Sequence, residues 1–300
     1  MLRTLPLLVM AILLSGAAPE RTIVLPNPAD QSGAGLAKAC EGRDGWDDPV
    51  GPARLFGNTW YVGTCGITAL LVTSPQGHVL IDTGPANTWR FIINNIERAG
   101  FRPGDVRWIV GSHEHHDHVG GVAAIARETR AKVAALPAQA AALRRGQVEP
   151  ADPQAAIHPA MAPARVHVEL VDGRELRVGP LRLRPVSTPT HSAGSTSWSW
   201  QSCEGRDCRT FTYADSATAV SADNYRFVDH PDRIAMVRRG LDRIAALPCG
   251  MLVTPHPSAS GLFERLATGS LAVDRGACRA YAKSARERFD ARLAKERATP

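Results

Sequence analysis

The pattern of hydrophobic and polar positions along the chain predicts alternating strands and helices. Short apolar runs bounded by turn residues are typical of strands, and apolar residues three or four positions apart indicate helices that bury one face. In the first 130 residues this pattern predicts strands over residues 60–62, 67–72 and 78–82, a helix over 89–100, a strand over 106–110 and a helix over 119–129. The alternation favours an α/β fold.

The second half of the chain continues in the same way. The pattern there predicts strands over residues 166–170, 175–178, 181–186, 196–201, 210–214 and 251–254, and helices over residues 232–247 and 271–295. Residues 150–163 are rich in Pro and Ala, and they predict a long loop within one domain. We therefore expect a single domain over residues 19–300.

Residues 1–18 are typical of a secretory signal peptide. Arg3 gives a positive start, an apolar core follows over residues 5–14, and Gly16-Ala17-Ala18 offers small residues for cleavage. The core is shorter than the ~20 residues that a membrane span needs. We therefore expect a periplasmic protein without a membrane span.

Export makes disulfides the expected use of the six cysteines. A zinc site built on cysteines is the alternative, but the sequence has no C-x-x-C pair. Among the possible pairings, the simplest joins neighbours along the sequence: Cys40 with Cys65, Cys203 with Cys208, and Cys249 with Cys278.

The chain carries a formal charge of +6 at pH 7 and has a pI near 9.2. Charges of both signs are scattered along it, and no Lys/Arg block resembles a nucleic-acid arm. We therefore expect no nucleic-acid partner.

The strongest chemical signal follows the predicted strand at residues 106–110. Residues 112–121 are Ser-His-Glu-His-His-Asp-His-Val-Gly-Gly. Neutral imidazoles and a carboxylate suit Zn²⁺ as ligands, and packing alone gives no reason to gather them where a strand ends. A surface charge run or a set of structural histidines is the alternative, which we disfavour because charged groups are rarely buried without partners.

The spacing of the residues divides this cluster into two groups of candidate metal ligands. Residues two apart share one side of an extended chain but not of a helix, so His113 and His115 can bind one ion only from a looped or strand-like segment. Asp117 and His118 then point elsewhere, as a second ion would require. The residues that fall between these ligands should face away: Glu114 and His116.

Two further histidines follow predicted strands, where sites are often built. His191 comes after the strand at residues 181–186, and His256 comes after the strand at residues 251–254. Alone, each would more often be a structural histidine than a ligand. With the cluster, they complete a set of five histidines and one aspartate.

These motifs resemble those of the metallo-β-lactamase superfamily. The resemblance is carried by H-x-H-x-D-H at residues 113–118, Leu-Ile-Asp-Thr-Gly at 80–84, Thr-Pro-x-His…Gly-x-x-Ser-Trp at 188–198 and His-Pro at 256–257. It covers nearly the whole chain after residue 18, and the sequence is most similar to the B3 subclass of true metallo-β-lactamases. The resemblance implies a four-layer αββα sandwich with its site at one edge of two packed sheets.

The resemblance also implies two zinc ions per chain. It places six ligands around them: His113, His115 and His191 around the first, and Asp117, His118 and His256 around the second. Thr190 and Ser192 stand where Gly and Thr are usual in B3 enzymes, but neither change removes a ligand. The cysteine positions also resemble a group of B3 enzymes with three disulfides between sequence neighbours.

The segment after the strand at residues 210–214 leaves alternatives open. Ser216 stands where other subclasses have a zinc-binding Cys, which supports B3, whereas glyoxalase-II-like relatives bridge two metals with an Asp near Asp215. We favour Ser216 pointing into the site and Asp215 in a structural or supporting role. Ser216 and Thr218 match the positions of hydroxyl groups that bind the substrate carboxylate in B3 enzymes. The alternative is a turn in which these hydroxyl groups form hydrogen bonds with the backbone of their own segment. Asp82 either supports a ligand imidazole or caps a turn.

The resemblance implies a zinc metallo-β-lactamase that hydrolyses penicillins, cephalosporins and carbapenems and so gives antibiotic resistance. Zinc lowers the pKa of bound water to about 7, so a hydroxide that bridges the two ions is the expected nucleophile. Asp117 is the expected catalytic residue, and we expect a monomer. The alternatives are a related hydrolase of thioesters or lactones and a non-catalytic zinc-binding periplasmic protein.

Overall fold

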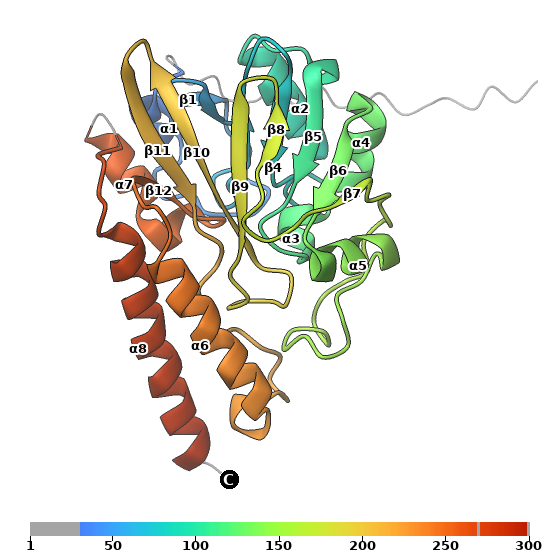
Figure 1. The fold of residues 1–300 in the computed structure, drawn as a ribbon, viewed down its shortest axis with the longest axis vertical. Coiled ribbons are helices and arrows are strands. Elements are labelled where there is room, and N and C mark those ends of the chain that lie inside the picture. Colours follow the sequence, from blue (N-terminus) through green and yellow to red (C-terminus); the bar gives the residue numbers. More distant parts are fainter. Residues whose placement is uncertain (1–30, 269–270, 299–300) are drawn as a thin grey trace, which may run out of the picture.

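The computed structural model describes residues 31–268 and 271–298. The predicted signal peptide, residues 1–18, lies outside them. The chain forms two β-sheets that pack face to face, with helices on both outer faces (Figure 1). The predicted four-layer αββα sandwich is confirmed.

The first sheet holds seven strands in chain order. Neighbours from β1 to β4 pair antiparallel, and neighbours from β4 to β7 pair parallel. The strands are β1 (Ala53–Phe56), β2 (Thr59–Tyr61), β3 (Leu70–Val72), β4 (His78–Ile81), β5 (Val106–Val110), β6 (Lys132–Ala135) and β7 (Val168–Glu169).

The second sheet has five strands in the order β12-β11-β10-β9-β8. All its neighbours pair antiparallel except β11 and β12, which pair parallel. The strands are β8 (Leu176–Val178), β9 (Leu181–Ser187), β10 (Thr196–Glu204), β11 (Asp207–Tyr213) and β12 (Met251–Val253).

Five of the helices form the two outer layers. α2, α4 and α5 pack on the first sheet, and α6 and α8 pack on the second, at the orange and red end of Figure 1. The α-helices are α1 (Gly33–Ala39), α2 (Trp89–Arg98), α3 (His116–Val119), α4 (Val122–Thr129), α5 (Pro137–Arg145), α6 (Pro231–Ala245), α7 (Leu262–Ala267) and α8 (Ala277–Ala298). Three short 3₁₀ helices are η1 (Pro103–Asp105), η2 (Phe227–Asp229) and η3 (Pro257–Ser260).

Alternating strand residues build separate hydrophobic cores on the two faces of the first sheet. Leu70 and Ile81 belong to the core between the sheets, whereas Leu71 and Leu80 belong to the core beneath the outer helices. Burying one such side chain stabilises the fold by roughly 1.5–3 kcal/mol. A slip of one residue would exchange the two faces, so this burial fixes the register of β3 and β4. The register in turn fixes where the strand ends, and the candidate site lies there.

The structure differs from the sequence prediction in several elements. The helix predicted over residues 119–129 begins at Val122 as α4, and Gly120 and Gly121 separate it from the short helix α3 (His116–Val119), which was not predicted. A Cβ atom on Gly121 would lie 2.6 Å from the carbonyl oxygen of Thr83, so glycine lets the chain approach the end of β4. The last helix begins at Ala277 rather than at residue 271. Six α-helices and strands were not predicted: α1, β1, α3, β6, α5 and α7.

Three disulfides join the cysteines as predicted: Cys40 with Cys65, Cys203 with Cys208, and Cys249 with Cys278. Within the described residues, no helix combines the length and the apolar character that a membrane crossing requires.

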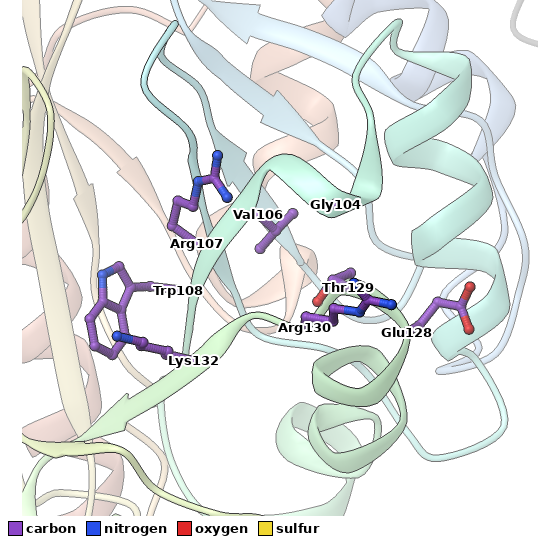
Figure 2. Close-up of a pocket in the computed structure, with 8 residues that line it drawn as sticks. All are labelled: Gly104, Val106, Arg107, Trp108, Glu128, Thr129, Arg130 and Lys132. Atoms are coloured by element: carbon purple, nitrogen blue, oxygen red, sulfur yellow. The ribbon is translucent and has the colours of Figure 1, made fainter.

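A cavity of about 600 Å³ opens at the amino ends of β5 and β6 (Figure 2). Charges of both signs line it, from Arg107, Arg130, Lys132 and Glu128. The histidine cluster follows the carboxyl end of β5. The cavity therefore lies at the opposite end of the strand from the candidate site.

Candidate metal centre

The predicted ligands come together where five strands end at one edge of the sandwich. Asp82 follows β4, residues 113–118 follow β5, and His191 comes shortly after β9. Asp215 follows β11, and His256 follows β12. Segments that lie far apart in the sequence thus deliver polar side chains to one place.

The first donor set consists of His113, His115 and His191, all of them buried. One ring nitrogen from each lies within 4.8 Å of the others, and Nδ1 of His115 is 3.1 Å from Nε2 of His191. Nε2 of His113 is buried and has no hydrogen-bond partner among the described residues. An unpaired buried nitrogen is costly in a folded protein, and a metal ion would satisfy it.

The second donor set is a triangle of Asp117, His118 and His256. Oδ2 of Asp117 lies 3.1 Å from Nε2 of His118 and 3.4 Å from Nε2 of His256, and the two Nε2 atoms are 3.3 Å apart. Tetrahedral zinc with bonds of about 2.0–2.1 Å separates its ligand atoms by about 3.3 Å. The residues present therefore fit a metal ion in both donor type and spacing.

The two donor sets adjoin each other. His113 is also grouped with Asp117 and His118, because their donor atoms lie within 4.8 Å of one another. The ring centres of His113 and His118 are 4.3 Å apart. The arrangement can therefore hold two neighbouring ions, with His113 on the boundary between them.

Each histidine of the two sets has its other ring nitrogen close to a carboxylate or carbonyl oxygen. Such contacts fix the tautomer and orientation of a metal-binding imidazole. The pairs are His113 Nδ1 with Asp215 Oδ1 at 2.8 Å, His115 Nε2 with Asp152 Oδ2 at 3.2 Å, His118 Nδ1 with Asp82 Oδ2 at 3.2 Å, His191 Nδ1 with the Thr218 carbonyl at 2.7 Å and His256 Nδ1 with the Gly66 carbonyl at 3.2 Å.

These contacts bear on two alternatives left open by the sequence. Asp82 lies beside the His118 imidazole and accepts hydrogen bonds from Ser112 and Tyr213, so its position favours the supporting role over the turn cap. Asp215 accepts a hydrogen bond from His113, which agrees with the supporting role that we favoured. Burial is the main cause that raises the pKa of Asp215 to about 8.

The protonation states of the donor sets follow from burial and mutual contact. Burial, helped by the proximity of His115, lowers the pKa of His191 to about 3. Burial likewise holds the pKa of His113 well below its usual value. Both imidazoles are therefore neutral at pH 7, which is the form that binds metal.

Asp117 and His118 shift each other in opposite directions. Burial alone would lower the pKa of His118, but Asp117 and Asp82 raise it to about 10. Burial alone would raise the pKa of Asp117, but His118 and His256 hold it well below its usual range. Asp117 is therefore an ionised carboxylate, as a metal ligand must be.

The two residues that fall between the ligands lie outside both donor sets. Glu114 is buried and accepts hydrogen bonds from the Ser192 hydroxyl and from the backbone N–H of Gly194. His116 begins α3, and its Nδ1 atom lies 2.8 Å from Nδ1 of His158.

The predicted substrate-binding hydroxyls lie close to the first donor set. Thr218 accepts the hydrogen bond of His191 through its carbonyl, and its Oγ1 atom lies 3.3 Å from Nδ1 of the same ring. Ser216 follows Asp215 in the segment after β11 and is 5% exposed.

Three residues near the donor sets were not predicted from the sequence. Asp152 and Gln154 lie on the long Pro/Ala-rich loop, and Nε2 of Gln154 is 3.2 Å from Nε2 of His191. Trp46 is 44% exposed, and its ring centre lies 5.7 Å from that of His116 and 5.8 Å from that of His256. Trp46 therefore stands at the rim of the site. No motif surrounds these residues, so only the fold could associate them with the histidines.

Two adjoining donor sets of histidine and aspartate at one edge of an αββα sandwich suit a metal-assisted hydrolase. A family model described as the metallo-beta-lactamase superfamily matches residues 62–204. The chain belongs to the metallo-β-lactamase superfamily.

Solved structures of metallo-β-lactamases are similar to nearly the whole described chain. The MIM-1 metallo-β-lactamase from Novosphingobium pentaromativorans is 51% identical, with a TM-score of 0.85, and the match covers 88% of this chain and 98% of that one. The Rm3 metallo-β-lactamase is 44% identical, with a TM-score of 0.80 and coverage of 84% and 97%. MEM-A1, a subclass B3 metallo-β-lactamase from a soil metagenome library, is 38% identical, with a TM-score of 0.81 and coverage of 85% and 100%.

Curated relatives match shorter segments. The human metallo-beta-lactamase domain-containing protein 1 is 35% identical over 60 residues, which are 20% of this chain and 23% of that protein. The hydroxyacylglutathione hydrolase of Anaeromyxobacter dehalogenans is 31% identical over 156 residues, which are 52% of this chain and 48% of that protein. The chain thus matches half or less of the length of these relatives.

Proposed function

We propose that this chain is a zinc-dependent hydrolase that opens the β-lactam ring of penicillins, cephalosporins and carbapenems. The observation that supports this most strongly is the second donor set, in which three ligand atoms lie 3.1 to 3.4 Å apart. Solved metallo-β-lactamases that align along almost their whole length add to the case. Antibiotic resistance is the expected consequence for the host.

We assign the two donor sets to two zinc ions. The first set is His113, His115 and His191, and the second is Asp117, His118 and His256. Zinc held by these residues would supply a hydroxide at neutral pH and a Lewis acid for the β-lactam carbonyl.

The protein's own groups place the substrate and the attacking water. Asp117 is the proposed catalytic residue, because its ionised carboxylate can accept a hydrogen bond from the water and orient it for attack. The hydroxyl groups of Ser216 and Thr218 are proposed to donate to the carboxylate beside the ring nitrogen of the substrate. Thr218 already contacts His191, so a substrate held by it would lie beside the first donor set.

We further propose a periplasmic location and a monomeric state. The signal-peptide pattern at residues 1–18 supports export, and three disulfides suit an oxidising compartment. Fractionation of cells that express the full chain, followed by size-exclusion chromatography with light scattering, tests both statements.

Thioester hydrolysis is the second candidate function, because the hydroxyacylglutathione hydrolase shares a matched segment of 156 residues. In glyoxalase-II-like relatives an Asp near Asp215 bridges two metals. Here Oδ1 of Asp215 accepts a hydrogen bond from Nδ1 of His113, on the side of the ring away from the donor nitrogen. This contact favours a β-lactamase over a thioesterase.

One assay separates the candidates. Purified protein is tested for hydrolysis of a chromogenic cephalosporin and of a glutathione thioester, with and without a chelator. We expect chelator-sensitive cephalosporin turnover and little thioester turnover. The opposite preference would establish the second candidate, and bound zinc without turnover of either substrate would indicate a non-catalytic binding protein.

A further inference from the structure

The loop that carries His191, residues 188–195, is held on one side by a buried arginine. Arg233 on α6 is 8% exposed. Its Nη2 atom donates to the carbonyl oxygens of Thr190 and His191, at 3.1 and 2.7 Å. α6 also approaches the loop closely, since a Cβ atom on Gly240 would lie 2.3 Å from Oγ1 of Thr190.

A buried carboxylate holds the other side of the same loop. Glu114 is 1% exposed and lies in the segment that carries His113 and His115. Its Oε2 atom accepts the Ser192 hydroxyl at 2.8 Å, and its Oε1 atom accepts the Gly194 N–H at 3.0 Å. A Cβ atom on Gly194 would lie 2.3 Å from Oε2, so glycine at this position allows the loop to approach the carboxylate closely.

We infer that Glu114 and Arg233 are positioning residues that set His191 at metal-binding distance from His113 and His115. The inference rests on the proposed metal-dependent function. Arg233 fixes the backbone before and at His191, and Glu114 fixes the residues just after it. The third histidine of the first donor set is thereby tied to the segment that carries the other two.

The chemistry of the two side chains suits this role. A carboxylate that accepts two hydrogen bonds fixes both the distance and the orientation of the groups that donate to it. A guanidinium that donates to two carbonyl groups does the same for its acceptors. Groups that hold ligands in place typically change metal affinity about 10- to 100-fold when they are removed. A role in loop stability alone would lower the melting temperature and leave zinc affinity unchanged.

The test measures zinc affinity by competition with a chromogenic chelator, together with the melting temperature of the metal-free protein. Glu114→Ala should raise the dissociation constant of the first zinc site about 10- to 100-fold. Glu114→Gln should restore most of the affinity, because the amide can still accept from Gly194 and can donate to the Ser192 hydroxyl. Arg233→Met should weaken binding in the same direction as Glu114→Ala.

Matched controls come from exposed residues of the same charge. Glu128→Gln on α4 and Arg239→Met on α6 should bind zinc like the unmodified protein. If Glu114→Ala does not fold, Ser192→Ala removes one of the two hydrogen bonds and should give an intermediate loss of affinity. Unchanged zinc affinity in the Glu114 or Ser192 variants, whatever their melting temperatures, would overturn the inference. The readout needs no β-lactam, so a failure of the proposed substrate class remains a separate result.

Discussion

Oδ2 of Asp82, at the end of β4, lies 3.2 Å from Nδ1 of His118, while the Asp82 carboxylate also accepts hydrogen bonds from Ser112 and Tyr213. Asp82 adopts a left-handed backbone conformation, with φ of 62°. This conformation is uncommon outside glycine and is found mainly in Asn and Asp. The carboxylate thus joins the first sheet, the second sheet and one member of the second donor set.

Asp82→Ala should therefore weaken the second zinc site more than the first. Ligand-supporting groups of this kind are worth about 10- to 100-fold in metal affinity. At a zinc concentration that just fills both sites of the unmodified protein, the variant should bind fewer than two ions per chain, toward one. Asp207→Ala, at the exposed start of β11, is the control and should keep both ions. Equal weakening of both sites would show that Asp82 supports the sheet rather than His118.

Removal of metal should abolish activity, and added Zn²⁺ should restore it. The reason is that two complete three-residue donor sets lie within reach of each other. Metal analysis at saturating Zn²⁺ should find two ions per chain. Full activity with a single bound ion would rule out the proposed two-ion site.

Asp117→Ala should lower kcat far more than His116→Ala. Asp117 is a member of the second donor set, whereas His116 contacts His158 and Trp46 outside both sets. We expect a loss of at least about 100-fold for Asp117→Ala and a small change for His116→Ala. Steady-state kinetics on one cephalosporin, with zinc content measured in parallel, provides the comparison. Comparable losses in both variants would contradict the division of this segment into ligands and non-ligands.

The double variant Ser216→Ala/Thr218→Val should raise KM for a penicillin or a carbapenem while the zinc content stays the same. Hydrogen bonds to a charged group contribute roughly 1.5–3 kcal/mol each, so KM should rise by one to two orders of magnitude or more. An unchanged KM would remove both hydroxyls from the substrate site. Loss of zinc would instead indicate that this segment helps to hold the metal ligands. Thr218 contacts His191, so this outcome is a distinct alternative.

Replacement of Cys249 and Cys278 together by Ala should lower the free energy of unfolding by about 2–4 kcal/mol. This disulfide joins the segment before β12 to the start of α8 across 29 residues. Urea denaturation of oxidised protein gives the value. Mass spectrometry of the unmodified protein should detect three bridges and no free thiol, and a different pairing would contradict the structure.

Much of the sandwich could be predicted because its buried strands are short apolar runs bounded by turn residues. β3 and β4 were predicted in this way, since the residues on both of their faces are buried in the two cores. β6 and α5 were missed because each is short and rich in alanine, which gives little contrast between faces.

The residues of the candidate site also fall into those that the sequence could predict and those that it could not. Ligands within one short motif, such as His113 and His115, could be predicted from spacing because neighbouring residues share a local conformation. Asp152 could not, because it lies 37 residues from His115 on a loop whose path only the tertiary fold determines.

The position of His256 after an edge strand makes the second donor set depend on the C-terminal part of the chain. Its other two members, Asp117 and His118, lie in the segment after β5, whereas His256 follows β12, which pairs in parallel with β11. Parallel neighbours cannot be joined by a tight hairpin, so the connection through α6 carries the chain back to the edge of the sheet where β12 pairs. Displacement of β12 from β11 would therefore take one ligand away from the second donor set. Occupancy of the second position thus reports whether this C-terminal strand is in its native place.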